Sequence, residues 1–116
     1  MKAVLVISHG SRSGKTVAEV RALTKELKSR SGLAIIDYAF LEIVSPSIPE
    51  GIKNCVEKGA NDITILLNFL NAGKHVDEDI PRIVKEARNH YPHVTIKLTK
   101  PIGQHKEIAD LFLDLI

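Results

Sequence analysis

The sequence is poor in residues that several classes of function require. It has 116 residues with one cysteine and no tryptophan, and aromatic residues make up 4% of the chain. A single cysteine, Cys55, excludes an internal disulfide and a cysteine-rich zinc or iron–sulfur site, and we expect it to be a small core residue. The scarcity of aromatics disfavours a base-stacking surface. The net charge of +2 is too weak to indicate a nucleic-acid partner.

Long apolar runs are also absent. No run approaches the roughly 20 residues that are needed to span a bilayer. The N-terminal segment MKAVLVISHG has too short an apolar stretch for a signal peptide, and no small-residue cleavage site follows it. We therefore expect a single globular domain over residues 1–116, cytoplasmic, with no membrane partner and no nucleic-acid partner.

The residues that are present alternate between strand patterns and helix patterns. Strands are predicted at Ala3–Ile7, Ile35–Leu41, Ile63–Leu67 and Val94–Thr99. Helices are predicted over about 15–30, where Val17, Val20, Leu23 and Leu27 recur at helical spacing, then over 48–56, from Asp77 through Ala87, and over 108–115. This order predicts an α/β fold, a four-stranded parallel sheet flanked by helices and flavodoxin-like in arrangement.

Local signals refine these elements. Ser47 and Glu50 have the spacing of a capping box, and Asp77 is a plausible N-cap. We interpret the acidic trio 77–79 as helix capping rather than as a metal site. The alternation in Val94–Thr99 predicts an edge strand with one exposed or partner-covered face. The apolar C-terminal helix indicates either burial against a partner or a longer parent protein.

Two histidines and a glutamate follow three of the predicted strands. His9 comes after the first strand, Glu42 closes the second, and His75 lies in the loop after the third. Because the carboxyl ends of parallel strands share one edge, we expect these side chains to meet. Imidazole and carboxylate together suit a divalent metal or proton transfer. His105 also lies at this edge with an open role, whereas His90 and His93 are predicted surface residues at the opposite edge.

Other residues near the histidines suit an anionic, flat ligand. Arg12, Lys15 and Lys74 place positive charge there. Phe69 and Leu70 are unusual in a loop, where they are either core residues or one wall of a hydrophobic pocket.

The first loop resembles a P-loop but does not match one. Gly14-Lys15-Thr16 would require a glycine at position 9, which is histidine. Nucleotide hydrolysis is therefore disfavoured, whereas weaker anion binding by the Gly-Ser-rich turn and the following helix start remains open.

An ordered series of motifs resembles the small sirohydrochlorin chelatases of the CbiX/SirB type, the class II chelatases. The matching pieces are His9-Gly10-Ser11-Arg12, Leu41-Glu42, Pro46-Ser47-Ile48, Gly59-Ala60, Phe69-Leu70, Gly73-Lys74-His75, Asp79-Ile80-Pro81 and Pro101-Ile102-Gly103-Gln104-His105. The resemblance covers almost the whole chain. It departs at Ser8, where the family often has glycine, and at Asn68, where proline is common.

The resemblance implies ATP-independent insertion of a divalent metal (cobalt, iron or nickel) into sirohydrochlorin, which feeds siroheme, cobalamin or a nickel cofactor. In the family, residues matching His9 and His75 bind metal and assist proton removal, with a carboxylate at Glu42 in some members. Short members act as homodimers.

Further residues are expected to bind the macrocycle. We assign substrate contact to Ser11, Arg12, Lys15, Phe69, Leu70 and Lys74, because cations suit the carboxylate rim and apolar side chains suit the ring. Two alternatives stay open at this point: a non-catalytic tetrapyrrole or metal carrier, and a metal-independent enzyme acting on a phosphate ligand.

Overall fold

The computed structural model describes all of residues 1–116, and its elements follow the predicted order. The elements are β1 (Lys2–Ser8), α1 (Gly14–Ser31), β2 (Ile35–Phe40), α2 (Ile48–Glu57), β3 (Asp62–Leu67), the π-helical turn η1 (His75–Asp79), α3 (Ile80–His90), β4 (Thr95–Pro101), the 3₁₀ turn η2 (Ile102–Gln104) and α4 (Ile108–Leu113). No helix is both long and apolar enough to cross a membrane.

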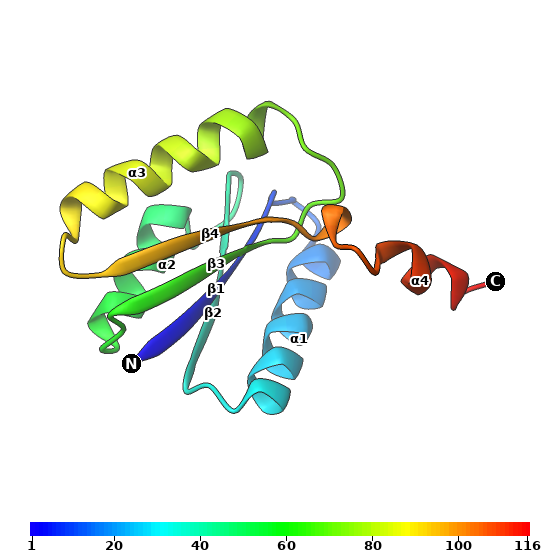
Figure 1. Cartoon of the computed structure of the whole chain (residues 1–116), viewed down its shortest axis with the longest axis horizontal. Coiled ribbons are helices and arrows are strands. Elements are labelled where there is room, and N and C mark those ends of the chain that lie inside the picture. The colour runs from blue at the N-terminus through cyan, green and yellow to red at the C-terminus, as the bar shows by residue number, and fades with distance from the viewer.

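The four strands form one parallel sheet in the order β2-β1-β3-β4. The predicted fold class is therefore confirmed, and all four carboxyl ends lie along one edge (Figure 1). The last strand lies slightly later in the chain than predicted. Val94 lies outside β4, and Pro101, which was expected in a turn, ends the strand. A register shift between Ile65 and Leu67 accompanies this longer pairing.

The main core lies between the sheet and two helices. Alternate residues of β1, namely Ala3, Leu5 and Ile7, face α2 and α3, which bury Ile52 and Val84 completely. Cys55 is also fully buried, as predicted. Burial of this thiol, followed by the nearby carboxylate of Asp37, raises the pKa of Cys55 to about 12.

The start of α2 carries the predicted capping box. The Glu50 amide donates to Ser47 Oγ over 3.3 Å, and the Ser47 amide donates to Glu50 Oε1 over 3.2 Å. The Glu50 carboxylate accepts hydrogen bonds from the side chain and then the backbone of Ser47, and these bonds lower the pKa of Glu50. Two orphan amide groups are satisfied in this way, which fixes where the helix begins.

The start of α3 differs from the prediction. Asp77 is not an N-cap, because the chain already turns helically from His75 through η1 before α3 begins at Ile80. The amide of Ile80 bonds to the carbonyl of His75, which is the wide spacing of a π turn. The acidic trio therefore lies inside a helical turn, which begins at His75 rather than after an N-cap at Asp77.

The other face of the sheet is covered only in part. Helix α1 packs against β2, and its buried residues are Val20 and Thr24. Leu23, which belongs to the predicted apolar stripe, is 41% exposed. Helix α4 does not fill the remaining space, because it projects away from the body of the molecule (Figure 1).

Candidate metal centre

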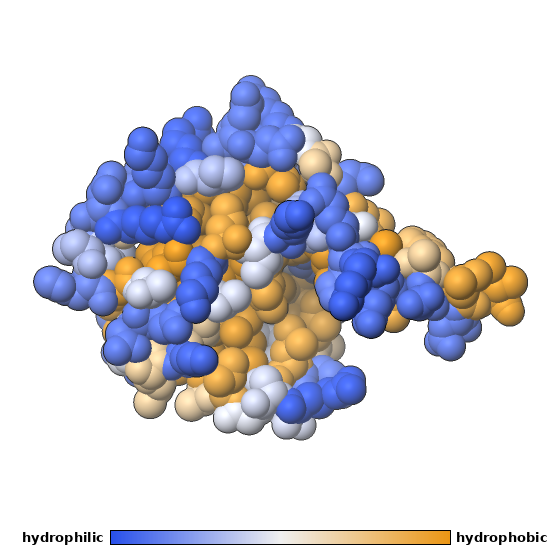
Figure 2. Space-filling view, in the orientation of Figure 1, coloured by the Kyte–Doolittle hydropathy of each residue, from blue (hydrophilic) through white to orange (hydrophobic).

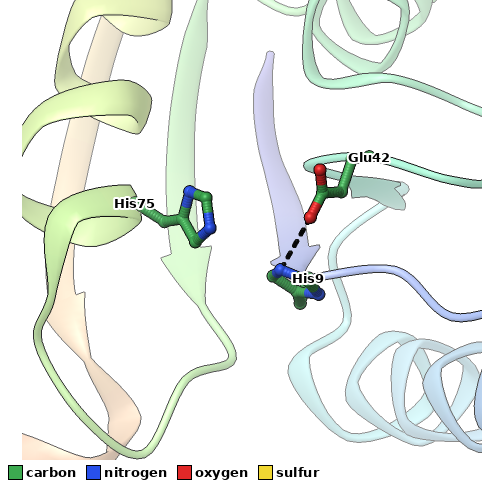
Figure 3. A group of neighbouring side chains, drawn as sticks. All are labelled: His9, Glu42 and His75. Atoms are coloured by element: carbon green, nitrogen blue, oxygen red, sulfur yellow. Dashed lines mark ion pairs between the residues drawn. The ribbon is translucent and has the colours of Figure 1, made fainter.

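Three side chains from separate strand ends meet at the carboxyl edge of the sheet. His9 follows β1 directly, Glu42 lies just beyond β2, and His75 begins η1 after the loop that follows β3. One ligand atom from each residue lies within 4.8 Å of the other two. Figure 3 shows the three side chains pointing toward a common space. The predicted convergence of His9, Glu42 and His75 is present in the structure.

Glu42 is held beside His9 by backbone hydrogen bonds. The amide of Leu41 donates to the Ser8 carbonyl over 2.9 Å, and the amide of Glu42 donates to the His9 carbonyl over 3.1 Å. These bonds continue the β1–β2 pairing past the end of the sheet. A tight turn follows, in which the Val44 amide bonds to the Glu42 carbonyl over 2.9 Å and Ile43 has a φ of 76°. A positive φ is unfavourable for a β-branched residue, so strain is stored next to Glu42.

Gly10 permits this close approach of the two loops. It has a φ of 110°, and a Cβ at this position would collide with the carbonyl oxygen of Glu42. No other residue type fits both the backbone conformation and the contact. The glycine of the His9-Gly10 motif is therefore required by the position of Glu42.

The hydrogen bonds of His9 define which nitrogen faces Glu42. Nδ1 lies 3.2 Å from the Gly10 carbonyl oxygen, an acceptor, so Nδ1 carries the proton in that bond. Nε2 lies 2.9 Å from Glu42 Oε1. Since an ionised carboxylate only accepts, the space between these atoms suits a proton or a metal cation.

His75, like His9, has its Nδ1 next to an oxygen acceptor. Its Nδ1 lies 2.8 Å from Asp79 Oδ2, one turn later in the chain. The hydrogen bond from His75 lowers the pKa of Asp79, so this carboxylate is ionised and accepts the Nδ1 proton. The lone pair of His75 Nε2 is then free. Such carboxylate–histidine pairs orient metal ligands and raise their basicity.

Two imidazole nitrogens and one carboxylate form the resulting donor set. This combination suits borderline divalent ions such as Fe²⁺, Co²⁺ and Ni²⁺ and leaves coordination positions open. The side chains remain accessible, with His9 47%, Glu42 50% and His75 47% exposed. A centre of this kind accepts an ion and still presents it to a second ligand.

The predicted cations lie in the two loops that carry the histidines or at the start of α1, and none is neutralised by an ion pair. Arg12, Lys15 and Lys74 are exposed and form none of the ion pairs in the structure. Ser11, which was predicted to bind substrate, accepts a bond from the Ser13 amide over 3.1 Å and so also shapes the loop. Their contact with a substrate stays a prediction.

Phe69 and Leu70 have different environments. Phe69 is half-buried and packs against the main core, whereas Leu70 is 60% exposed. The loop that carries them is fixed by Gly103, whose amide donates to the Phe69 carbonyl over 3.0 Å. A Cβ at Gly103 would collide with the Leu70 carbonyl, so this second glycine is also required by a close approach. Leu70 is the better placed of the two to contact a ligand.

The remaining candidates lie outside the donor set. His105 Nδ1 accepts a bond from the Glu107 amide over 3.0 Å, which gives this histidine a local structural role. Asp79 was missed as the partner of His75. Asp79 follows His75 by four residues, a spacing that brings two side chains together only when the backbone between them is helical. The sequence did not show that the helical backbone begins at residue 75.

The two departures from the family pattern contact one another. Asn68 Nδ2 donates to Ser8 Oγ over 3.0 Å, and the Asn68 amide donates to the Ile7 carbonyl over 2.8 Å. The first bond links Ser8, at the end of β1, to Asn68, which follows β3, and Ser8 directly precedes His9. Ser8 and Asn68 therefore form a matched pair in this chain.

The parallel α/β sheet carries two histidines and a carboxylate at its carboxyl edge, a donor set that suits a divalent ion. The CbiX family model matches residues 3–116, and the chain belongs to that family. The sirohydrochlorin ferrochelatase of Priestia megaterium is 32% identical over 100% of this chain and 44% of its own length. The sirohydrochlorin cobaltochelatase of Sulfolobus acidocaldarius is 34% identical over 96% of this chain and 86% of its own length.

A solved structure of a sirohydrochlorin chelatase is also similar to this chain. The sirohydrochlorin chelatase SirB from Bacillus subtilis subspecies spizizenii, in complex with cobalt, superposes with a TM-score of 0.87 at 31% identity. That match covers 97% of this chain and 48% of SirB. The chain thus spans about half the length of several relatives that it matches, and most of the length of the Sulfolobus protein.

Proposed function

We propose that this chain inserts a divalent metal ion into sirohydrochlorin, as a homodimer and without a nucleotide. The observation that carries this proposal is the shared orientation of the two histidines. Each has its Nδ1 bonded to an oxygen acceptor, so that both Nε2 atoms are directed to the space beside Glu42. The relatives that are named as sirohydrochlorin ferrochelatase and cobaltochelatase support the substrate.

The metal is a substrate in this reaction, so it has to be released after it is bound. His9 Nε2, His75 Nε2 and the Glu42 carboxylate hold the ion, while open positions admit the nitrogens of the macrocycle. Imidazole and carboxylate bind such ions less firmly than thiolates do, and the only cysteine of the chain lies buried in the core. The donor set therefore favours transfer of the ion rather than its storage.

Insertion exchanges one divalent ion for two pyrrole protons. As each bond from the metal to a protein ligand breaks, the freed imidazole or carboxylate becomes a base within reach of the ring nitrogens. Two imidazoles and one carboxylate are sufficient to accept both protons, which then pass to water. No phosphoryl transfer is needed in this scheme.

The surroundings of the centre fit a flat polycarboxylate. Arg12, Lys15 and Lys74 supply unpaired positive charge for the carboxylates of the macrocycle rim, and exposed Leu70 supplies apolar surface for the ring. Positive charge also raises the local concentration of an anionic substrate.

An insertion assay tests the proposal. Purified protein is mixed with sirohydrochlorin and Co²⁺, Fe²⁺ or Ni²⁺ in parallel, and the absorption spectrum of the macrocycle is followed. We expect multiple turnovers above the uncatalysed rate, and loss of those turnovers in His9→Ala and in His75→Ala. His93→Ala is the matched control, because His93 is exposed and lies far from the centre in the fold.

Two results would contradict the proposal. Full insertion activity in both active-site variants would reject the assignment of the histidines. Stoichiometric binding of sirohydrochlorin with no acceleration of insertion would identify a carrier of the same fold instead of an enzyme.

A further inference from the structure

Exposed apolar side chains are few in the body of this protein. Between residues 2 and 107, only four large apolar side chains are exposed, namely Leu23, Ile43, Leu70 and Ile102. Leu23 and Ile102 line the groove beside α1, and Figure 2 shows apolar surface on that side of the sheet. The other two, Ile43 and Leu70, are not part of that groove and lie in loops at the carboxyl edge of the sheet.

These two exposed side chains belong to the loops that carry the candidate metal ligands. Ile43 directly follows Glu42 in the loop after β2, and Leu70 lies in the loop that leads from β3 to His75. Ile43 is 55% exposed and Leu70 is 60% exposed. Because β2 and β3 pair with opposite sides of β1, the two side chains belong to segments on opposite sides of His9.

The backbone at Ile43 is strained. Its φ is 76°, and the Val44 amide donates a hydrogen bond of 2.9 Å to the Glu42 carbonyl, so Ile43 is the central residue of a tight turn. It is the only residue other than glycine with a positive φ in this chain. Isoleucine is poorly suited to this conformation because its side chain branches at Cβ, whereas glycine or asparagine adopts it at a lower cost. The backbone alone therefore disfavours isoleucine at this position.

Packing within the chain does not compensate for this strain. Ile43 does not pack against the main core, whereas its neighbour Leu41 does. A side chain that is apolar, exposed and strained adds nothing to folding that a glycine would lack. Strained residues are concentrated at functional sites, where the surrounding structure holds them in place for binding or catalysis. The position of Ile43 next to Glu42 agrees with such a role.

We propose that Ile43 is a substrate-contacting residue, whose side chain packs against the tetrapyrrole ring while the ring lies over the metal centre. The proposal rests on the proposed function, because the ring is the substrate of that reaction. Neighbouring strands lie about 4.8 Å apart, so the loops after β2 and β3 are about 10 Å apart, which is comparable with the width of a tetrapyrrole ring. Ile43 contacts the ring on the side of β2, and Leu70 contacts it on the side of β3.

The contact serves substrate binding rather than metal chemistry. Isoleucine has no donor atom for a metal ion and no proton to transfer, so its contribution is the burial of apolar ring surface. The tight turn leaves the backbone of Ile43 little freedom, and therefore little order has to be gained when the ring binds. The strain is the cost of holding an apolar side chain beside Glu42.

Replacement of Ile43 should raise stability and weaken substrate binding at the same time. In Ile43→Gly, we expect the Tm to rise by about 2–5 °C, because glycine adopts the positive φ without strain. We expect sirohydrochlorin to bind about 3- to 10-fold more weakly, which corresponds to burial of roughly half of an isoleucine side chain. Equilibrium dialysis without metal measures this binding, and calorimetry should show an unchanged affinity for Co²⁺. A residue that only shaped the loop would not move stability and binding in opposite directions.

Ile43→Leu is the matched control. It keeps an apolar side chain of the same size without the branch at Cβ, so sirohydrochlorin should bind to it as to the wild type. Ile43→Asn tolerates a positive φ but offers a polar side chain, so it should bind sirohydrochlorin as weakly as Ile43→Gly does. Wild-type affinity in both the glycine and the asparagine variant would overturn the proposal. A changed sedimenting mass in these variants would also overturn it, because Ile43 would then lie at a contact between copies of the chain.

Dialysis without metal separates this proposal from the proposed function. If binding of sirohydrochlorin depends on Ile43 but the wild type inserts no metal, the contact stands and the enzymatic function fails. If the wild type inserts metal and Ile43→Gly binds sirohydrochlorin as tightly as the wild type does, the enzymatic function stands and the contact fails.

Discussion

His75 and Asp79 form an ion pair within a single π-helical turn, with 2.8 Å between Nδ1 and Oδ2. The turn sets which nitrogen of His75 is free to bind metal. In the proposed function, the Asp79 carboxylate is not a ligand itself but acts on the metal through the histidine that it orients.

Removing that carboxylate should weaken metal binding without unfolding the protein. In Asp79→Ala, we expect the affinity for Co²⁺ to fall by about 10- to 100-fold, which is the usual effect of losing such a partner. Isothermal titration calorimetry with Co²⁺ measures it. Asp77→Ala is the control, because Asp77 lies in the same turn and its carboxylate forms no ion pair or hydrogen bond. Equal affinities in the two variants would refute the role of Asp79.

A side chain at Gly10 should separate Glu42 from His9. We expect Gly10→Ala to lose about 1–3 kcal/mol of stability, because alanine is strained at this positive φ and collides with the Glu42 carbonyl. Co²⁺ affinity should fall with it, as measured by calorimetry beside chemical denaturation. Gly14→Ala is matched to it, since a Cβ at Gly14 meets nothing within 4 Å. The idea fails if both alanine variants bind Co²⁺ as the wild type does.

The capping box of α2 should contribute stability but not metal binding. Ser47→Ala removes the acceptor of the Glu50 amide, and we expect a loss of about 1 kcal/mol in the free energy of unfolding. Thermal unfolding and Co²⁺ titration are run on the same sample. A loss of Co²⁺ affinity comparable to that in Asp79→Ala would show that α2 is coupled to the centre, contrary to this expectation.

The buried thiol should make stability depend on pH in the alkaline range. Burial raises the pKa of Cys55 from 9.0 to about 12, so the folded protein keeps the proton after the unfolded chain has lost it. Below pH 9.0 the thiol is protonated in both states and the free energy of unfolding does not depend on it. Above pH 9.0 the unfolded chain ionises first, so the free energy of unfolding decreases as the pH rises. Denaturation at pH 8 and pH 10 should show a smaller decline in Cys55→Ala than in the wild type. At pH 8, a thiol reagent should label Cys55 only after denaturant is added.

The positions of His9, Glu42 and His75 could be predicted from the sequence because parallel strands place their carboxyl ends together. The strand patterns were also clear enough to give bounds within about two residues in each case. The partner of His75 could not be predicted in the same way. It depends on where the helix begins, and the acidic trio 77–79 suited a cap at Asp77 equally well.

Close approaches between loops could not be predicted from the sequence either. Gly10 and Gly103 are required because carbonyl groups from distant segments lie against them, and a pattern along one chain does not contain that information. Likewise, Leu23 belongs to a regular helical stripe, yet it is exposed here. An apolar stripe indicates that a surface is to be covered, but not by which element.

The accessibility of the metal centre has a consequence for selectivity. Three half-exposed donors impose no cavity size and no rigid geometry on the ion that they accept. For nitrogen and oxygen donors of this kind, Cu²⁺ binds more tightly than Fe²⁺, Co²⁺ or Ni²⁺. The proposed function therefore predicts that Cu²⁺ competes with the substrate ion at this centre, and that the supply of metals in the surroundings decides which ion is inserted.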